Sequence, residues 1–267
     1  GGNQERTQKS IPEYIADRCL ADPEPVVAYL TGRGIDDAVI RKAIQKRSLG
    51  WNTWVSDKKP AGEPGHGGPA AAFIVRSPET RRVEAVDLRF ENPEINGGVK
   101  TQCQGRKDAL IWTSDLARLD RAKTVYVVES PINALSVESC GLPSATAAIA
   151  IRGTGNADKF DLAFLYGKRV VIALGHADRI NEHSGLRPGL AAAWKLSERL
   201  VAADISSMLV DMQDWDEGED INDVLKSLGS DELRTRLRKL ESWLIPGMPG
   251  GGDRLQGTRR VFLPEHD

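Results

Sequence analysis

From position 124 onward, short apolar runs alternate with segments of helical periodicity, and this alternation constrains the fold more than any other feature. The predicted strands cover 125–128, 145–151, 169–174 and 206–210, and the predicted helices cover 132–140, 157–165, 189–202 and 231–243. Strands that are separated by helices pair in parallel and are covered on both faces. The sequence therefore predicts an α/β domain with a parallel sheet flanked by helices.

The residues before position 122 predict two smaller units. Apolar residues at three- and four-residue steps predict helices over 12–20 and 23–30, and Asp36 or Asp37 begins a third helix. Short β-like runs predict an antiparallel sheet from segments 71–76, 83–90, 100–103 and 110–113. Between these units, residues 57–69 mix Lys, Gly and Pro without periodicity, which is typical of a flexible loop.

We therefore expect four parts along the chain. They are a helical lead-in, a small α+β subdomain, the α/β domain and a flexible Gly- and Pro-rich tail, over 1–50, 51–121, 122–245 and 246–267. The chain is 40% hydrophobic and 28% charged, and no apolar run approaches the roughly 20 residues of a membrane span. Because no export signal is evident either, we expect a cytoplasmic protein with no membrane partner.

Acidic residues follow three of the predicted strands. Glu129 comes after the first, Asp178 after the third, and the segment G-E-D-I-N-D, with Asp220 and Asp223, after the fourth. Ligands of open α/β sheets bind outside the carboxyl ends of the strands, so these acids should meet at one rim. Clustered carboxylates resist joint ionisation unless a cation neutralises them, and Mg²⁺ prefers oxygen ligands. Asp220 and Asp223 suit a helix N-cap equally well.

The stretch from 123 to 228 resembles the Toprim domain of bacterial primases, topoisomerases and some nucleases. The segment V-Y-V-V-E-S-P-I-N-A-L-S places Glu129 at the family's glutamate, with Asn133 where an Asp is usual. The segment V-V-I-A-L-G-H-A-D resembles the strand that ends in Asp-x-Asp, but Gly175 and Ala177 hold the two aspartate positions. The resemblance implies metal ligation by Glu129, Asp220 and its neighbour Asp223, with Asp178 as a candidate in place of the missing pair.

The residues upstream resemble the remainder of a primase polymerase core. The segments V-D-L-R-F and G-V-K-T are similar to its small sheet, where an Arg and a Lys face nucleic acid or nucleotide, and they imply that role for Arg89 and Lys100. Arg187 precedes Pro188 and Gly189 at the start of the helix predicted over 189–202. There it would address a phosphate together with free backbone N–H groups.

The resemblance implies a primase-like replication protein of a plasmid, phage or other mobile element. It would synthesise primers on single-stranded DNA from nucleoside triphosphates with Mg²⁺ or Mn²⁺, and a helicase or another replication protein is a candidate partner. A second hypothesis is a catalytically degenerate Toprim module that binds nucleic acid or a replication partner, because Gly175 and Ala177 remove two carboxylates. A third is a Toprim nuclease, which the primase-like upstream half disfavours.

Overall fold

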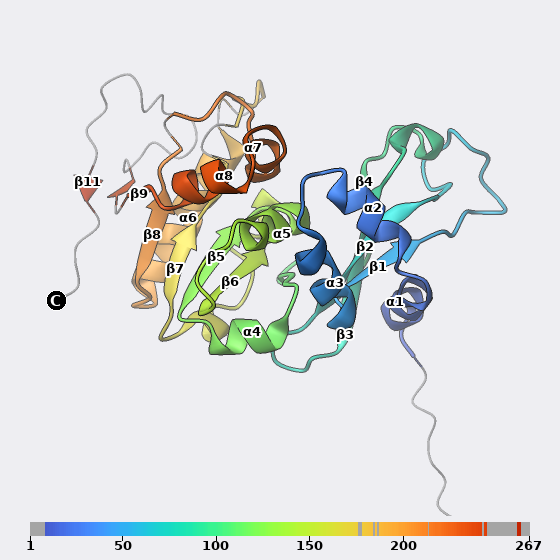
Figure 1. Cartoon of the computed structure of the whole chain (residues 1–267), viewed down its shortest axis with the longest axis horizontal. Helices are drawn as coiled ribbons and strands as arrows, with labels where there is room; N and C mark the ends of the chain where they lie inside the picture. The colour runs from blue at the N-terminus through green and yellow to red at the C-terminus, as the bar shows by residue number, and fades with distance from the viewer. Residues whose placement is uncertain are drawn as a thin grey trace, which may run out of the picture.

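The computed structural model describes residues 9–175, 178–183, 185, 187–212, 214–241, 243–244 and 261–262. Figure 1 shows a small antiparallel sheet with the first three helices on one side of the molecule and a parallel sheet with the later helices on the other. The predicted tail from 246 onward lies outside the described residues, apart from the short strand at 261–262.

Three helices open the chain, as the sequence predicts: α1 (Ile11–Ala21), α2 (Pro25–Thr31) and α3 (Asp37–Gln45). Ser10 and Glu13 form a capping box at the start of α1, in which each side chain accepts a hydrogen bond from the other's backbone N–H. Asp36 caps α3 by accepting from two backbone N–H groups. Local sequence is therefore sufficient to begin these helices.

The antiparallel sheet has the order β1 (Leu49–Asn52), β2 (Ala70–Arg76), β3 (Val83–Phe90) and β4 (Thr101–Gly105). The sequence did not predict β1, which contains a glycine. A Cβ at Gly50 would lie 2.5 Å from the carbonyl oxygen of Cys19, so the glycine lets α1 approach the sheet closely. The predicted strand at 110–113 is wrong, because in this segment only Trp112 forms an isolated bridge, with Ala150.

The segment predicted as a flexible loop contains no regular helix or strand, but it is tied to the fold. The turn η1 (Pro93–Asn96) ends in Asn96, whose buried side-chain oxygen accepts from the backbone N–H of Gly65 at 2.9 Å and of Gly67 at 3.0 Å. Val55 and Gly67 form a bridge at the base of the loop. Side-chain hydrogen bonding therefore replaces secondary structure here.

The second sheet has the strand order β6-β5-β7-β8-β9, and the first four of these strands are parallel. They are β5 (Thr124–Val128), β6 (Thr146–Ala150), β7 (Arg169–Ile172) and β8 (Ser207–Val210), and β9 (Leu240–Glu241) pairs antiparallel with β8. The helices around it are α4 (Leu116–Arg121), α5 (Pro131–Ser139), α6 (Pro188–Ala202), α7 (Ile221–Leu228) and α8 (Ser230–Leu237). The predicted fold class is confirmed.

Two predicted helices differ in the structure. In place of a helix, the segment 157–165 contains a single 3₁₀ turn, η3 (Ala163–Leu165), and it directly follows another, η2 (Thr154–Asn156). The last helix ends at Leu237, because the following residues form β9. A further short pair joins β10 (Trp243–Leu244) and β11 (Val261–Phe262).

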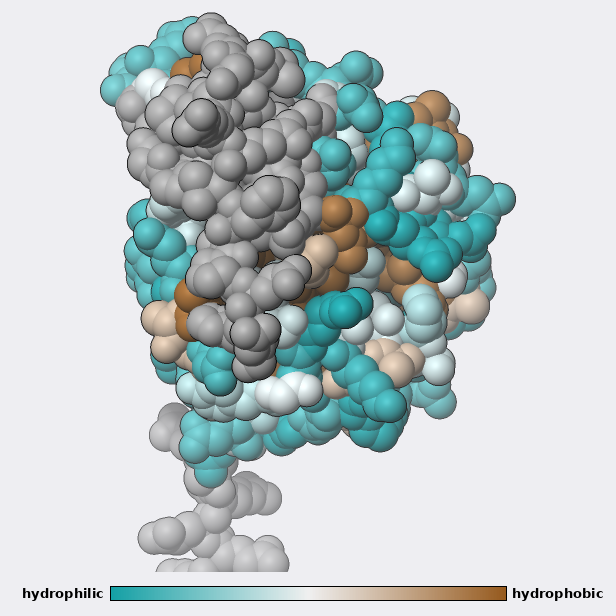
Figure 2. All heavy atoms as spheres, turned by 90° about the vertical axis from the view of Figure 1, so that its left-hand side faces the viewer, coloured by the Kyte–Doolittle hydropathy of each residue, from teal (hydrophilic) through white to brown (hydrophobic). Residues whose placement is uncertain are grey.

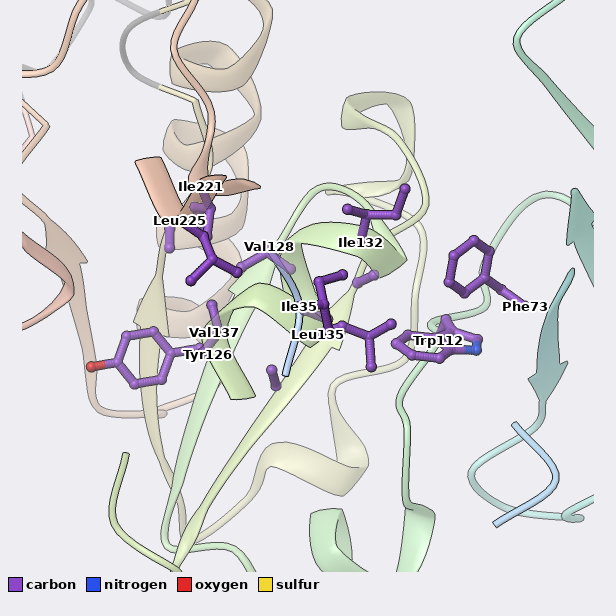
Figure 3. Close-up of a cluster of buried hydrophobic side chains, with 14 of the residues drawn as sticks. Ile35, Phe73, Trp112, Tyr126, Val128, Ile132, Leu135, Val137, Ile221 and Leu225 are labelled. Carbon is purple, nitrogen blue, oxygen red and sulfur yellow. The ribbon is translucent and has the colours of Figure 1, made fainter. Parts of the chain in front are cut away.

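Alternate residues of the parallel strands enter two hydrophobic clusters. Val125 and Val127 pack with the buried side of α6, whereas Tyr126 and Val128 pack with α5, α7 and α8. This alternation follows from the two-residue period of a strand and explains why both faces of the sheet are apolar. Figure 3 shows Tyr126 and Val128 beside Leu135 and Val137 of α5 and Ile221 and Leu225 of α7.

The same cluster continues into the small sheet. Trp112 lies edge-on to Phe73 of β2 with ring centroids 5.4 Å apart, and its indole N–H donates to the carbonyl of Ser48 at 3.1 Å. Ile35 of the helical lead-in lies near Leu135 in Figure 3 and belongs to this cluster too. One apolar core therefore holds the small sheet against the parallel sheet, so that β3 and β4 face the rim where β5 and β6 end.

In the part of the chain that the structure describes, no helix has both the length and the apolar character needed to cross a membrane. Figure 2 shows hydrophilic residues over much of the face that it turns to the viewer, with smaller apolar areas between them.

Candidate functional site

A cavity of about 850 Å³ lies between the small sheet and the carboxyl ends of the parallel strands. The small sheet contributes Arg89 of β3 and Gln102 of β4, the rim contributes Glu129, and the start of α7 contributes Asp220 and Asp223. The cavity thus joins acidic residues of one half of the fold to a basic residue of the other.

Glu129 directly follows β5, and hydrogen bonds hold the backbone on either side of it. The hydroxyl of Ser130 caps α5 by accepting from the backbone N–H of Asn133 at 3.2 Å. The carbonyl of Glu129 accepts from the backbone N–H of Gly153 at 3.2 Å. The apolar strand, the cap and this contact together direct Glu129 to the rim, as the sequence predicts.

The carboxylate of Glu129 lies in an environment that opposes its ionisation. Burial, and then the negative charges of Asp178 and Asp220, raise its pKa to about 7 from an ordinary value of 4.5. Because this pKa is close to neutral pH, Glu129 is partly protonated there in the metal-free protein. A cation beside it would favour the ionised form.

Asp178 is held at the start of α6. Its Oδ2 atom accepts from the backbone N–H of Gly189 at 2.6 Å, and burial is the main reason why its pKa is raised. The guanidinium of Arg187 donates to the backbone carbonyl of Asp178 and lies 3.8 Å from the carboxylate of Glu217. Arg187 therefore fixes the Asp178 segment, and neither residue is among those that line the cavity.

Asp220 and Asp223 form a reciprocal capping box at the start of α7. Oδ1 of Asp220 accepts from the backbone N–H of Asp223 at 2.8 Å, and Oδ2 of Asp223 accepts from the backbone N–H of Asp220 at 3.0 Å. The cavity wall removes part of the water around Asp220, which, together with the charge of Asp223, raises the Asp220 pKa. The capping interpretation is confirmed, and metal ligation by these two residues stays a prediction.

A buried amide network, which the sequence did not reveal, links α5 to α7. The side-chain oxygen of Asn133 accepts from the backbone N–H of Asn222 at 3.2 Å. The Asn222 amide group in turn donates to Ser136 and to the carbonyl of Arg33, each at 3.0 Å. The network fixes the helix that carries Asp220 against the helix that follows Glu129.

The structure separates the two predicted basic residues. Arg89 lines the cavity, is partly buried and has no ion-pair partner among the described residues. Lys100 is exposed, precedes β4 and is not among the residues that line the cavity. The cavity lining holds three further cations, Arg33, Lys107 and Lys159, for which the sequence predicted no binding role.

Arg152 is a fourth missed residue, and it joins the two sheets. It follows β6 with a positive φ of 64°, and its side chain is only 2% exposed. The guanidinium donates to both carboxylate oxygens of Asp87 on β3, at 2.6 and 2.8 Å, and to the carbonyls of Arg106 and Lys107. Its position after an apolar strand was the same signal that pointed to Glu129.

The negative charges of the three acids suit a bound cation, but their side chains do not form a complete set of metal ligands among the described residues. Glu129, Asp178 and Asp220 all have raised pKa values, and the first responds to the charges of the other two. Within the described residues, no group of three acids, histidines or cysteines is close enough to enclose a metal ion. Gly175 is described at the expected place after β7, whereas His176 and Ala177 lie outside the described residues.

Comparison with known proteins assigns the class of the second half of the chain. Residues 124–231 match the Toprim domain family, so the chain carries a Toprim domain. No curated protein matches the chain.

The fold of the longer stretch of chain, which includes the small antiparallel sheet, is similar to that of DnaG primase catalytic cores. A DnaG catalytic core is 18% identical with a TM-score of 0.57, and the match covers 85% of this chain and 79% of that one. The zinc-binding and RNA polymerase domains of the Aquifex aeolicus primase are 19% identical with a TM-score of 0.53; 85% of this chain and 59% of that one are covered. A DnaG catalytic domain bound to single-stranded DNA is 16% identical with a TM-score of 0.53, over 85% and 78% of the two chains.

Proposed function

We propose that this protein is a primase-type nucleotidyltransferase that synthesises primers on single-stranded DNA from nucleoside triphosphates. The observation that carries the proposal is the shared cavity, in which Glu129 and Asp220 lie with Arg89 between a Toprim rim and a primase-like sheet. Its volume of about 850 Å³ suits a nucleotide or the end of a nucleic-acid strand. A helicase partner and a mobile-element origin stay predictions.

Glu129, with Asp178 and Asp220 near it, would hold Mg²⁺ or Mn²⁺. When bound there, the ion would stabilise the charge that develops on a triphosphate during nucleotidyl transfer. The carboxylates contribute by staying ionised in the cation's presence, which requires a proton to leave Glu129, whose pKa is about 7. The capping box holds Asp220 in place at the start of α7, where it lines the cavity.

The basic residues of the cavity would hold phosphates. Arg89 is suited to this role, because it lines the cavity from β3 and has no ion-pair partner among the described residues. Lys107 and Lys159 line the same cavity and are exposed, and Lys159 pairs with Asp108 at 3.1 Å. Both would contact the backbone of a strand that enters from solvent, with Lys159 exchanging Asp108 for a phosphate. Lysine and arginine contacts of this kind bind the backbone without regard to base sequence.

The proposal is tested by incubating the full chain with a single-stranded template, nucleoside triphosphates and Mg²⁺ or Mn²⁺. We expect labelled primers from the wild-type protein and none from Glu129→Gln. The control is Glu198→Gln, an identical chemical change at an exposed position of α6. Metal-dependent primer synthesis that persists in Glu129→Gln contradicts the role of this residue.

A second candidate, a Toprim module that binds nucleic acid without catalysis, is favoured by one observation. Gly175 stands where the family carries the first aspartate of its Asp-x-Asp pair, and the described residues contain no preformed three-ligand cluster. Such a module would bind single-stranded DNA with a steep salt dependence and no requirement for metal. Strong DNA binding without primer synthesis, and without cleavage of a labelled plasmid, would favour this candidate over the primase and the nuclease.

A further inference from the structure

We propose that the carboxylate of Asp178 takes the place of the side chain that is missing at Gly175, and that it acts as the second acid of the Glu129 site. The inference rests on the proposed function, because it assigns a residue to the metal site proposed there. Asp178 is three residues further along the chain, but its carboxylate lies where a side chain at position 175 would lie.

The geometry around Gly175 carries the first step. A Cβ atom built on Gly175 would lie 2.2 Å from Oδ1, 2.9 Å from Cγ and 3.2 Å from Oδ2 of Asp178. The Asp178 carboxylate thus fills the space into which a side chain at position 175 would project. Gly175 does not have a positive φ, so its backbone conformation does not require glycine. A side chain at position 175 would therefore require the Asp178 carboxylate to move.

A second glycine completes the arrangement. A Cβ at Gly189 would lie 2.5 Å from Oδ2 of Asp178 and 2.3 Å from the carbonyl oxygen of Gly175. Gly189 also lacks a positive φ, and its N–H donates to Oδ2 of Asp178 at 2.6 Å. Neither glycine is required by its φ angle, and both lie against the Asp178 carboxylate. The first turn of α6 packs on the same carboxylate through Gly189.

The position of Gly175 places this carboxylate at the correct end of the sheet. β7 pairs with β5 in parallel with Ile172 opposite Val127, and the N–H of Ala173 donates to the carbonyl of Val127 at 2.9 Å. Glu129 and Gly175 therefore follow neighbouring strands at the same rim. Because the Asp178 carboxylate occupies the side-chain space of residue 175, it lies at the same rim as Glu129.

The steric part of the inference is tested without metal by a double-mutant cycle in thermal unfolding. Gly175→Ala should lower the melting temperature by about 2–4 °C in the wild-type background, because it displaces Asp178 from the Gly189 N–H. In an Asp178→Gly background the same substitution should cause no further loss, because the space is vacant. Equal losses in both backgrounds would overturn the inference.

The functional part is tested by titrating Mn²⁺ into the full chain and following the free ion by electron paramagnetic resonance. We expect Asp178→Asn to weaken Mn²⁺ binding about tenfold or more. The exchange variant, Gly175→Asp with Asp178→Gly, should recover an affinity within about threefold of the wild type, because it supplies a carboxylate to the same space. Glu198→Gln is the control for a lost surface carboxylate.

The outcomes separate this inference from the proposed function. If Glu129→Gln loses Mn²⁺ binding while Asp178→Asn retains it, the inference is overturned and the proposed function stands. If Asp178→Asn loses binding and the exchange variant does not recover it, Asp178 acts only as the cap of α6, and the inference is likewise overturned. Absence of Mn²⁺ binding by the wild type overturns both.

Discussion

Replacing Glu129 with Gln should stabilise the metal-free protein at alkaline pH, although it removes the residue on which the proposed activity depends. Burial and the charges of Asp178 and Asp220 raise the Glu129 pKa to about 7 from 4.5. That difference corresponds to about 3 kcal/mol of unfavourable free energy for the ionised carboxylate in the folded protein. Glutamine keeps the shape of the side chain and carries no charge.

The sign of the pH dependence follows from the raised pKa. Between pH 4.5 and 7 the folded protein binds the Glu129 proton more tightly than the unfolded chain, so the contribution of Glu129 to stability falls as pH rises through this window. Above pH 7 the free-energy cost of the ionised Glu129 carboxylate has its full value and no longer changes with pH. The gain in unfolding free energy from Glu129→Gln should therefore be about 2 to 3 kcal/mol larger at pH 8 than at pH 5.

Urea unfolding of the wild type, Glu129→Gln and the exposed control Glu198→Gln at pH 5 and pH 8, all in a metal chelator, measures this difference. The control should shift little between the two pH values. Added Mn²⁺ should then stabilise the wild type, by about 2.7 kcal/mol at a hundredfold excess over its dissociation constant, and leave Glu129→Gln unchanged. A stability difference between wild type and Glu129→Gln that is the same at both pH values would refute the reasoning.

Three further predictions concern the surroundings of the site. Arg152→Ala should lower the free energy of unfolding by about 3 kcal/mol in urea, because it breaks a buried ion pair between the sheets; a change below about 1 kcal/mol would contradict this role. Lys107→Ala and Lys159→Ala should each reduce the salt slope of single-stranded DNA binding by about 0.7, whereas Lys195→Ala, at an exposed position of α6, should not. Asn96→Ala should speed proteolysis within 57–68, because two backbone N–H groups lose their acceptor; unchanged cleavage would count against this anchoring.

The elements that the sequence predicted correctly are those in which local pattern and tertiary burial agree. The strand predicted over 125–128, observed as β5 (Thr124–Val128), contains a continuous apolar run because both of its faces are covered. The segment 157–165 shows how the pattern misleads. Ala157 and Phe160, and again Leu162 and Leu165, are buried three residues apart as on a helix, yet the backbone forms short turns. β9 is only two residues long and depends on β8 for its existence, so it leaves no local signal.

The sequence predicted only those site residues whose positions are determined by the topology of the sheet. Glu129 and Asp220 follow from the rule that parallel strands end at a common rim. Lys159 and Arg33 could not be found in this way, because they reach the cavity from segments that are distant along the chain. The relation between Asp178 and Gly175 depends on the path of the chain after β7 and on the close approach of α6, neither of which is encoded in a spacing.

The central claim is that Glu129 binds a divalent cation at the cavity between the two sheets. A crystal of the full chain soaked with Mn²⁺ and a nucleoside triphosphate tests this claim most directly, through the anomalous scattering of the ion. The account predicts an anomalous peak about 2.2 Å from a carboxylate oxygen of Glu129, with the triphosphate toward Arg89. A bound nucleotide whose Mn²⁺ lies away from Glu129, or with no ion at this carboxylate, would contradict it.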